Sequence, residues 1–221
     1  MRERPILFSG PMVRAILAGH KTQTRRVAKP VRHPGWGNLY DPGVLAREPQ
    51  HTIDLSCPYG APGDRLWVRE SFWGCDAPGW GDQPCVVYDD EWHGKEYRPA
   101  EVRPWARKFG RIPSIHMPRD CSRITLEITG VRVERLHEIS EADAVAEGIP
   151  EESEPCEQCG DCGWLCIGGD PQECDAPGCG DGAIDGYRAL WEQINGAGSW
   201  QANPWVWVVE FRRIEDGIAH G

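Results

Sequence analysis

A short stretch near the amino end of the chain, residues 17–26, gathers side chains of unlike chemistry. It holds the amine of Lys21, the hydroxyl of Thr24 and the adjacent guanidinium groups of Arg25 and Arg26. A threonine hydroxyl becomes a nucleophile when a base takes its proton, and a lysine amine is such a base where burial or nearby cations depress its proton affinity. The alternative is a solvated helix end, where the macrodipole favours basic side chains.

The elements around this stretch decide whether its side chains can meet. Residues 11–18 predict a helix of about two turns, because Pro11 suits the first helical position and Gly19 supplies a left-handed exit. The threonines and charges that follow favour a strand. In a straight strand, Lys21 and Thr24 would lie on opposite faces. Both can face one pocket only if Lys21 lies in the turn before the strand.

A carboxylate far along the chain is a second candidate. Ser140 with Asp143 three residues on is close to a capping box. Residues 144–146 favour a helix, and Gly148 ends this helix. Glu147 therefore lies in the last helical turn, where the macrodipole disfavours a negative side chain. This unfavourable placement suggests a functional role. The alternative is a surface glutamate with no role.

Three further segments predict strands. Residues 65–73 and 123–133 alternate apolar with polar side chains, whereas 204–212 is apolar on both faces and is expected to lie centrally in its sheet. In the second segment the apolar side chains occupy even-numbered positions before Gly130 and odd-numbered positions after it. This shift by one residue predicts a β-bulge. Residues 31–62 show no sustained period and predict a long loop across the mouth of the fold, as in a lid. A helix over 186–194, capped by Asp185, precedes the last strand.

Length and charge bound the class of protein. The 221 residues suit one domain, 1–221, and no apolar run has the length of a signal peptide or membrane span, so we expect a cytoplasmic protein with no membrane contact. The net charge of −10 argues against indiscriminate nucleic-acid binding. However, residues 138–187 hold fourteen Asp or Glu and no Lys or Arg, which leaves +4 on the remainder. That asymmetry is compatible with binding one nucleoside or a short RNA.

Six of the ten cysteines cluster in an inserted segment, residues 150–183. Without an export signal, metal binding is favoured over disulfides. Two cysteine pairs bracket a knuckle of zinc-ribbon type and predict a structural zinc site: Cys156, Cys159, Cys174 and Cys179. The first four cysteines also have the spacing of an iron–sulfur run, so the identity of the metal stays open. Cys162 or Cys166 can replace one of the four ligands. A segment that binds no metal is the third alternative. No organic cofactor is expected.

Several of these segments resemble the ASCH domain, a small β-barrel related to the PUA RNA-binding fold. The resemblance covers residues 4–30, 60–73, 113–150 and 186–213, and the last of these is similar to phage and prophage versions of the domain. It implies an α+β, PUA-like mixed β-barrel with short flanking helices. The Cys-rich insertion has no counterpart in the typical domain.

The resemblance also implies an activity. In ASCH enzymes that hydrolyse N4-acetylcytidine, a helix of the 139–148 pattern carries the catalytic glutamate, and the match falls on Glu147. The implied site is that of an amidohydrolase in which Thr24 is the nucleophile, Lys21 its base, and Glu147 orients the lysine or shuttles a proton. Arg26 matches the arginine of these enzymes, which holds a base or sugar oxygen.

Other residues follow from the same resemblance. The strand over 65–73 ends beside the ligand cavity of the domain, which makes Arg69 and Glu70 candidates for substrate binding together with Arg25. The alternative for Arg69 and Glu70 is a cross-strand ion pair. Two other functions stay open: an RNA-binding module without catalysis, and a phage accessory protein that acts on an unknown protein partner.

Overall fold

A five-stranded sheet forms the centre of the fold. The structure is a computed structural model and describes residues 1–76, 84–88, 98–99, 111–150, 164–167, 170–173 and 182–214. The sheet has the order β1-β5-β10-β13-β2, and its strands are β1 (Glu3–Leu7), β5 (Arg65–Arg69), β10 (Thr125–Arg135), β13 (Trp205–Ile214) and β2 (Gln23–Val27). With the helices described below it makes a mixed α+β fold, in agreement with the coarser part of the predicted class.

The long ladder between β10 and β13 bends at the predicted bulge. Ile128 pairs with Phe211 and Gly130 with Glu210, so that Thr129 is the extra residue. A Cβ on Gly130 would lie 2.7 Å from Glu210 Oε2, so a larger residue here would displace the end of the Glu210 side chain. The bulge prediction is confirmed, and so is the central place of β13, which pairs with β10 on one side and β2 on the other.

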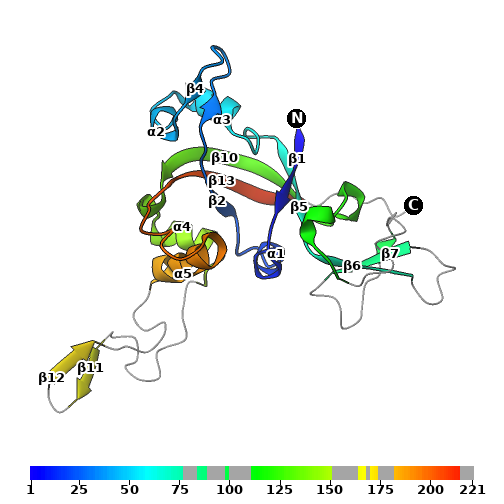
Figure 1. Cartoon of the computed structure of the whole chain (residues 1–221). Helices are drawn as coiled ribbons and strands as arrows, with labels where there is room; N and C mark the ends of the chain where they lie inside the picture. The colour runs from blue at the N-terminus through cyan, green and yellow to red at the C-terminus, as the bar shows by residue number, and fades with distance from the viewer. Residues whose placement is uncertain are drawn as a thin grey trace.

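The two edge strands of this sheet approach each other. β1 pairs only with β5, in parallel, and β2 pairs only with β13, in antiparallel direction, among the described strands. Arg26 Nη2, from β2, nevertheless donates to the carbonyl of Leu7 in β1 at 2.6 Å. The described strand pairs therefore form a curved open sheet (Figure 1), and a side chain rather than a backbone ladder links its edges.

Helices cover both faces of the sheet (Figure 1). α4 (Glu141–Ala146) and α5 (Ala183–Asn195) pack on one face, whereas α1 (Gly10–Leu17) contributes Val13 and Ile16 to the main hydrophobic core on the other. The predicted helix end at Gly19 is confirmed by its φ of 80°, and the Ser140–Asp143 capping box is present. The predicted cap of the last helix was wrong, because α5 begins at Ala183 and places Asp185 in its first turn.

The prediction of a long loop over residues 31–62 was also wrong. This segment contains the hairpin of β3 (Val31–Arg32) and β4 (Leu39–Tyr40), then α2 (Pro42–Leu45) and α3 (Gln50–Ser56). Leu45 and Ile53 are buried in the main hydrophobic core. Helices of this length span about one or two turns, too few to give a recognisable period.

The remaining described elements lie outside the central sheet. The predicted strand over 65–73 breaks at Glu70, where the chain leaves β5 for a smaller four-stranded sheet. That sheet has the order β8-β7-β6-β9, and its strands are β6 (Phe72–Asp76), β7 (Pro84–Tyr88), β8 (Arg98–Pro99) and β9 (Arg111–Ile112). Short 3-10 helices are η2 (Ser114–His116), η3 (Arg119–Cys121) and η4 (Leu136–Glu138), and a separate hairpin is formed by β11 (Trp164–Ile167) and β12 (Asp170–Glu173). In the described part of the chain, no helix is long and apolar enough to cross a membrane.

Candidate functional site

Lys21 and Glu147 meet in a buried contact between two helix ends. Lys21 lies in the turn between α1 and β2, as predicted, and Glu147 caps the C-terminus of α4. The Lys21 amine donates to Oε2 of Glu147 and to its backbone carbonyl, each at 2.7 Å. The backbones of the two residues also form an isolated antiparallel bridge. Since the exposed fractions of the two side chains are 0% and 2%, this ion pair is shielded from water.

Burial sets the electrostatics of this pair. Desolvation lowers the pKa of the Lys21 amine, and the neighbouring Glu147 carboxylate opposes this effect without cancelling it. The amine also lies 5.7 Å from the ring centre of Phe8, whose face attracts a cation. Lys21 therefore loses its proton more readily than a lysine in water does, which is what a general base requires.

Arg25 fixes the other side of the Glu147 carboxylate. Its Nη1 lies 3.4 Å from Glu147 Oε1, while its Nη2 reaches Glu134 at 2.7 Å and Asp143 at 3.2 Å. The guanidinium is completely buried and lies 5.9 Å from the ring centre of Tyr187. Both Nη groups of Arg25 are thus committed to carboxylates of the protein, and Glu147 is held by a cation on each oxygen.

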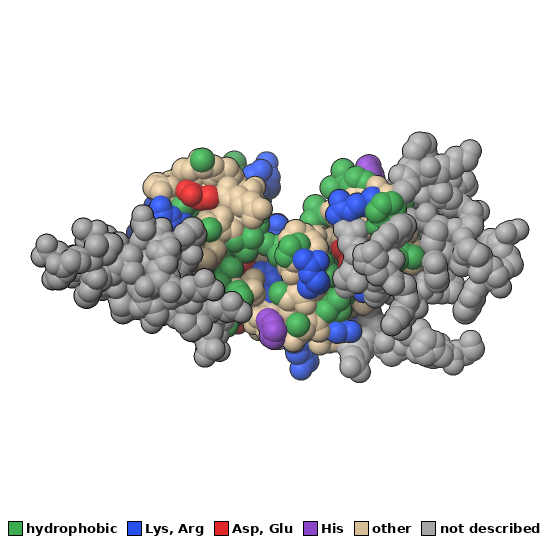
Figure 2. Space-filling view, turned by 90° about the horizontal axis from the view of Figure 1, so that it is seen from below, with side chains coloured by type: hydrophobic (Ala, Val, Ile, Leu, Met, Phe, Trp, Pro, Cys, Tyr) green, Lys and Arg blue, Asp and Glu red, His purple; other side chains and the backbone are tan. Residues whose placement is uncertain are grey.

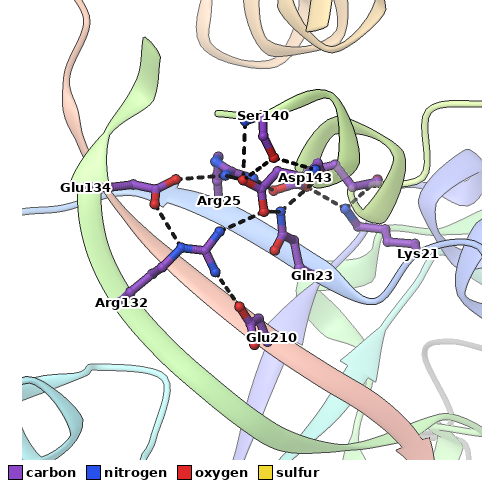
Figure 3. A network of polar contacts seen from close by, with 9 residues as sticks. Lys21, Gln23, Arg25, Arg132, Glu134, Ser140, Asp143 and Glu210 are labelled. Atoms are coloured by element: carbon purple, nitrogen blue, oxygen red, sulfur yellow. Dashed lines mark hydrogen bonds and ion pairs between the residues drawn. The ribbon is translucent and has the colours of Figure 1, made fainter. Parts of the chain in front are cut away.

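A second arginine extends this network toward the surface. Arg132 of β10 binds Glu134 at 2.8 Å, Asp143 at 2.7 Å and, from β13, Glu210. Side chains from β2, β10, β13 and α4 therefore converge on one cluster (Figure 3). Partial burial acts to raise the pKa of Asp143, but hydrogen bonds from Gln23 and Ser140 and the charge of Arg25 hold it well below its usual range. Arg132 and Glu134 were not predicted; their alternation on one face of β10 was the available signal.

A cavity of about 160 Å³ lies beside this network. Thr24 and Glu147 line it together, and the Thr24 hydroxyl forms no hydrogen bond with any described residue. The remaining lining combines two arginines with apolar side chains, mostly of α5: Met12, Arg25, Arg26, Val27, Tyr59, Tyr187, Leu190, Trp191, Ile194 and Asn195. Lys21 does not line the cavity and reaches it only through Glu147. The surface of the molecule beside α1 and α5 is hollowed, with hydrophobic side chains bordering Lys or Arg side chains (Figure 2).

A second cavity, of about 200 Å³, lies where the edges of β1 and β2 approach. Pro5, Ile6 and Leu7 form one wall, and Arg69 lines it from the end of β5. Arg26 and Tyr59 line both cavities, so the two spaces adjoin at these residues. Tyr59 was not predicted, because it follows α3 in the segment expected to be a loop.

Glu70 lies apart from both cavities. Its carboxylate receives two hydrogen bonds from Arg123, each at 2.9 Å, and its side chain is buried. The structure thus separates the neighbours Arg69 and Glu70: the first lines a cavity, and the second belongs to an ion pair. The four cysteines of the predicted zinc site, Cys156, Cys159, Cys174 and Cys179, lie outside the described residues. Within the described ranges, no group of three or more His, Cys, Asp or Glu side chains is placed to hold a metal ion.

Comparison with known proteins adds no assignment. No family model matches the chain, and neither curated proteins nor solved structures gave a match.

Proposed function

We propose that this chain is an ASCH-type, PUA-like protein that binds a cytosine nucleoside, free or within a short RNA, and hydrolyses an N-acyl group from its exocyclic amine. The curved sheet supports the fold assignment, since its edge strands approach as they would in an incompletely closed barrel. The proposed active site is the cavity lined by Thr24 and Glu147. The substrate would enter between α5 and the edge of β2.

One observation carries this proposal: a buried lysine and glutamate, 126 residues apart in sequence, share a contact of 2.7 Å beside a cavity that contains an unbonded threonine hydroxyl. A buried ion pair is weak evidence of stabilisation, because desolvation offsets the attraction between its charges. A lysine whose pKa is lowered by burial, in contact with a carboxylate that lines a cavity, is instead typical of active sites. The pair therefore favours a chemical role.

The proposed reaction follows from this arrangement. The Thr24 oxygen attacks the acyl carbon, and its proton passes to the Glu147 carboxylate and is shared with Lys21, whose lowered pKa lets the pair accept it. Arg26, which also lines the cavity, stabilises the oxygen anion of the tetrahedral intermediate. The bond between the acyl carbon and the exocyclic nitrogen then breaks as that nitrogen takes the proton. Water finally hydrolyses the acyl-threonine and releases the carboxylic acid.

The test is turnover of N4-acetylcytidine by the purified chain, followed as cytidine release, with an established ASCH amidohydrolase run alongside. We expect Thr24→Val to lower kcat/KM by about a thousandfold or more, as loss of a nucleophile does. The matched control is Thr22→Val, since Thr22 is exposed in the same segment. The activity is refuted if the wild-type chain releases no cytidine while the reference enzyme does.

A second candidate is an RNA-binding module without catalysis. Trp36 is 79% exposed, its ring lies 5.2 Å from that of His33, and Arg32 donates to the carbonyl of the adjacent Gly37. Exposed aromatic side chains next to cations stack on unpaired bases. This candidate predicts that Trp36→Ala weakens binding of a short single-stranded RNA, whereas the hydrolase proposal does not require Trp36.

We further propose structural zinc in the Cys-rich insertion. In the sequence, the β11–β12 hairpin follows the Cys156/Cys159 pair and precedes the Cys174/Cys179 pair, an order typical of zinc ribbons. Native mass spectrometry should find one zinc ion per chain, and the double variant Cys156→Ser/Cys159→Ser should lose it. Iron with visible absorbance would favour the iron–sulfur alternative.

A further inference from the structure

The second cavity contains guanidinium groups that the protein leaves unpaired. Arg26 and Arg69 both line it, and each has a buried Nε without a hydrogen-bond partner. With the described residues, each makes a single hydrogen bond, from Nη2 to a backbone carbonyl, Leu7 for Arg26 and Ile115 for Arg69. Within the described part of the chain, neither forms an ion pair with a carboxylate. The Nη1 group of each arginine is neither buried nor hydrogen-bonded to a described residue, so it has donors available for a ligand.

The lining of this cavity is suited to an anion. Besides the two arginines it consists of Pro5, Ile6, Leu7 and Tyr59, and it includes no acidic residue. Burial raises the pKa of Tyr59, so its phenol stays protonated and can donate a hydrogen bond. Two guanidinium groups and a phenol around one small space provide several donors and no negative charge, which is an arrangement suited to phosphate oxygens.

The position of the cavity relates this anion to the proposed substrate. Arg26 and Tyr59 line both cavities, so a ligand that extends past these two side chains would contact both Thr24 and Arg69. Ligand pockets in proteins usually have volumes of at least about 300 Å³. Each cavity alone has a smaller volume, whereas the two adjoining cavities together reach this range. A base with its acyl group would occupy the first space, and the sugar phosphate would occupy the second.

We propose that the second cavity is a phosphate subsite and that the substrate is a cytosine nucleotide rather than the free nucleoside. The accessible guanidinium nitrogens of Arg26 and Arg69 donate to the phosphate oxygens. The placement of the base rests on the proposed function, but the phosphate subsite does not, since it would bind phosphate even in a protein that catalyses nothing.

Binding measurements test the subsite without catalysis. Titration of the chain with inorganic phosphate should shift the NMR signals of the Arg26 and Arg69 Nε–H groups. Calorimetry should give cytidine 5′-monophosphate an affinity at least about tenfold above that of cytidine, the gain expected from one or more charge-assisted hydrogen bonds. If a cytidine dinucleotide binds as tightly as cytidine 5′-monophosphate, the natural source of the phosphate is an RNA phosphodiester. If the dinucleotide binds more weakly than the monophosphate, the natural ligand is the free nucleotide.

Variants locate the effect at Arg69. Arg69→Gln should lower the ratio of nucleotide to nucleoside affinity about tenfold, and Arg69→Lys should restore only part of it, because lysine lacks the planar fork of donors. Arg65→Gln is the matched control, since it removes the same charge from the other end of β5 and should leave the ratio at the wild-type value. Equal affinities for nucleotide and nucleoside, unshifted Nε–H signals, or equal effects of the Arg69 and Arg65 changes would overturn the proposal.

Discussion

Arg25 and Arg26 are neighbours in β2, yet the fold uses them in opposite ways. Arg25 pairs across the ladder with Val208, which belongs to the hydrophobic cluster of α4 and α5, and its guanidinium binds three carboxylates. Arg26 pairs with Trp207, in the cluster on the other face, and binds no carboxylate among the described residues. Arg26 is only partly buried, so its charge is kept without a carboxylate partner at less cost than a buried one. The comparison favours a structural role for Arg25 and leaves Arg26 as the better candidate for binding a ligand.

The ion pairs of Lys21, Arg25 and Arg132 with their carboxylates form what we call the paired region. The largest expected effect lies at its centre. Lys21→Ala should lower the free energy of unfolding by about 3–5 kcal/mol, because it leaves the buried Glu147 carboxylate without its closest cation. Urea unfolding followed by tryptophan fluorescence measures this loss. The double variant Lys21→Met/Glu147→Leu should recover much of it, since both charges are then removed. A loss below about 1 kcal/mol for the single variant would mean that the pair is as weak as an exposed one.

The adjacent arginines give the direct test of the comparison. Arg25→Ala should cost about 3 kcal/mol of stability, since it removes a fully buried cation from its carboxylates. Arg26→Ala should cost about 1 kcal/mol, because only one hydrogen bond and packing against Phe8 are lost, but it should weaken ligand binding. Unfolding and ligand titration of both variants separate the two roles. If Arg25→Ala and Arg26→Ala lower stability equally, the distinction between the two arginines is wrong.

The paired region should also make stability depend on acid. Because the folded-state pKa of Asp143 lies below its usual 3.8, its ionised form contributes stability that is present above about pH 4 and is lost as the pH falls toward the folded pKa. After allowance for its partial exposure, this contribution is on the order of 1 kcal/mol. Urea midpoints of wild type and Asp143→Asn between pH 6 and 2.5 should differ most at the upper end. A constant difference would show that Asp143 does not titrate in that window.

The sequence predicted the backbone of the candidate site better than its charges. Gly19, the capping box of Ser140 and the parity shift at Gly130 are local signals, and each placed its element correctly. The contact of Lys21 with Glu147 was an expectation from resemblance, because no local pattern relates residues so far apart. The different fates of Arg25 and Arg26 could not be predicted, since they depend on which core packs on each face of β2.

The segments that failed prediction lacked a periodic signal. In residues 31–62 the helices are short, so their buried positions gave no detectable pattern, and the role of Tyr59 at both cavities was missed with them. Glu70 showed the opposite problem. The resemblance made it a candidate for substrate binding and an ion pair was the alternative, but its partner Arg123 comes from a distant segment that only the folded chain brings near.

The smallest effect is expected at the rim of the paired region. In Gly130→Ala the added Cβ would meet Glu210 Oε2 at 2.7 Å, so the carboxylate must move and its ion pair with Arg132 would weaken. Glu210 is half exposed, and pairs of this kind contribute about 0–1 kcal/mol. Alanine in place of glycine in a strand recovers part of that, so unfolding should show a net change below about 1 kcal/mol. Glu210→Gln, which weakens the pair without added bulk, is the control. A much larger loss in Gly130→Ala alone would place the strain in the bulge itself rather than in the charged network.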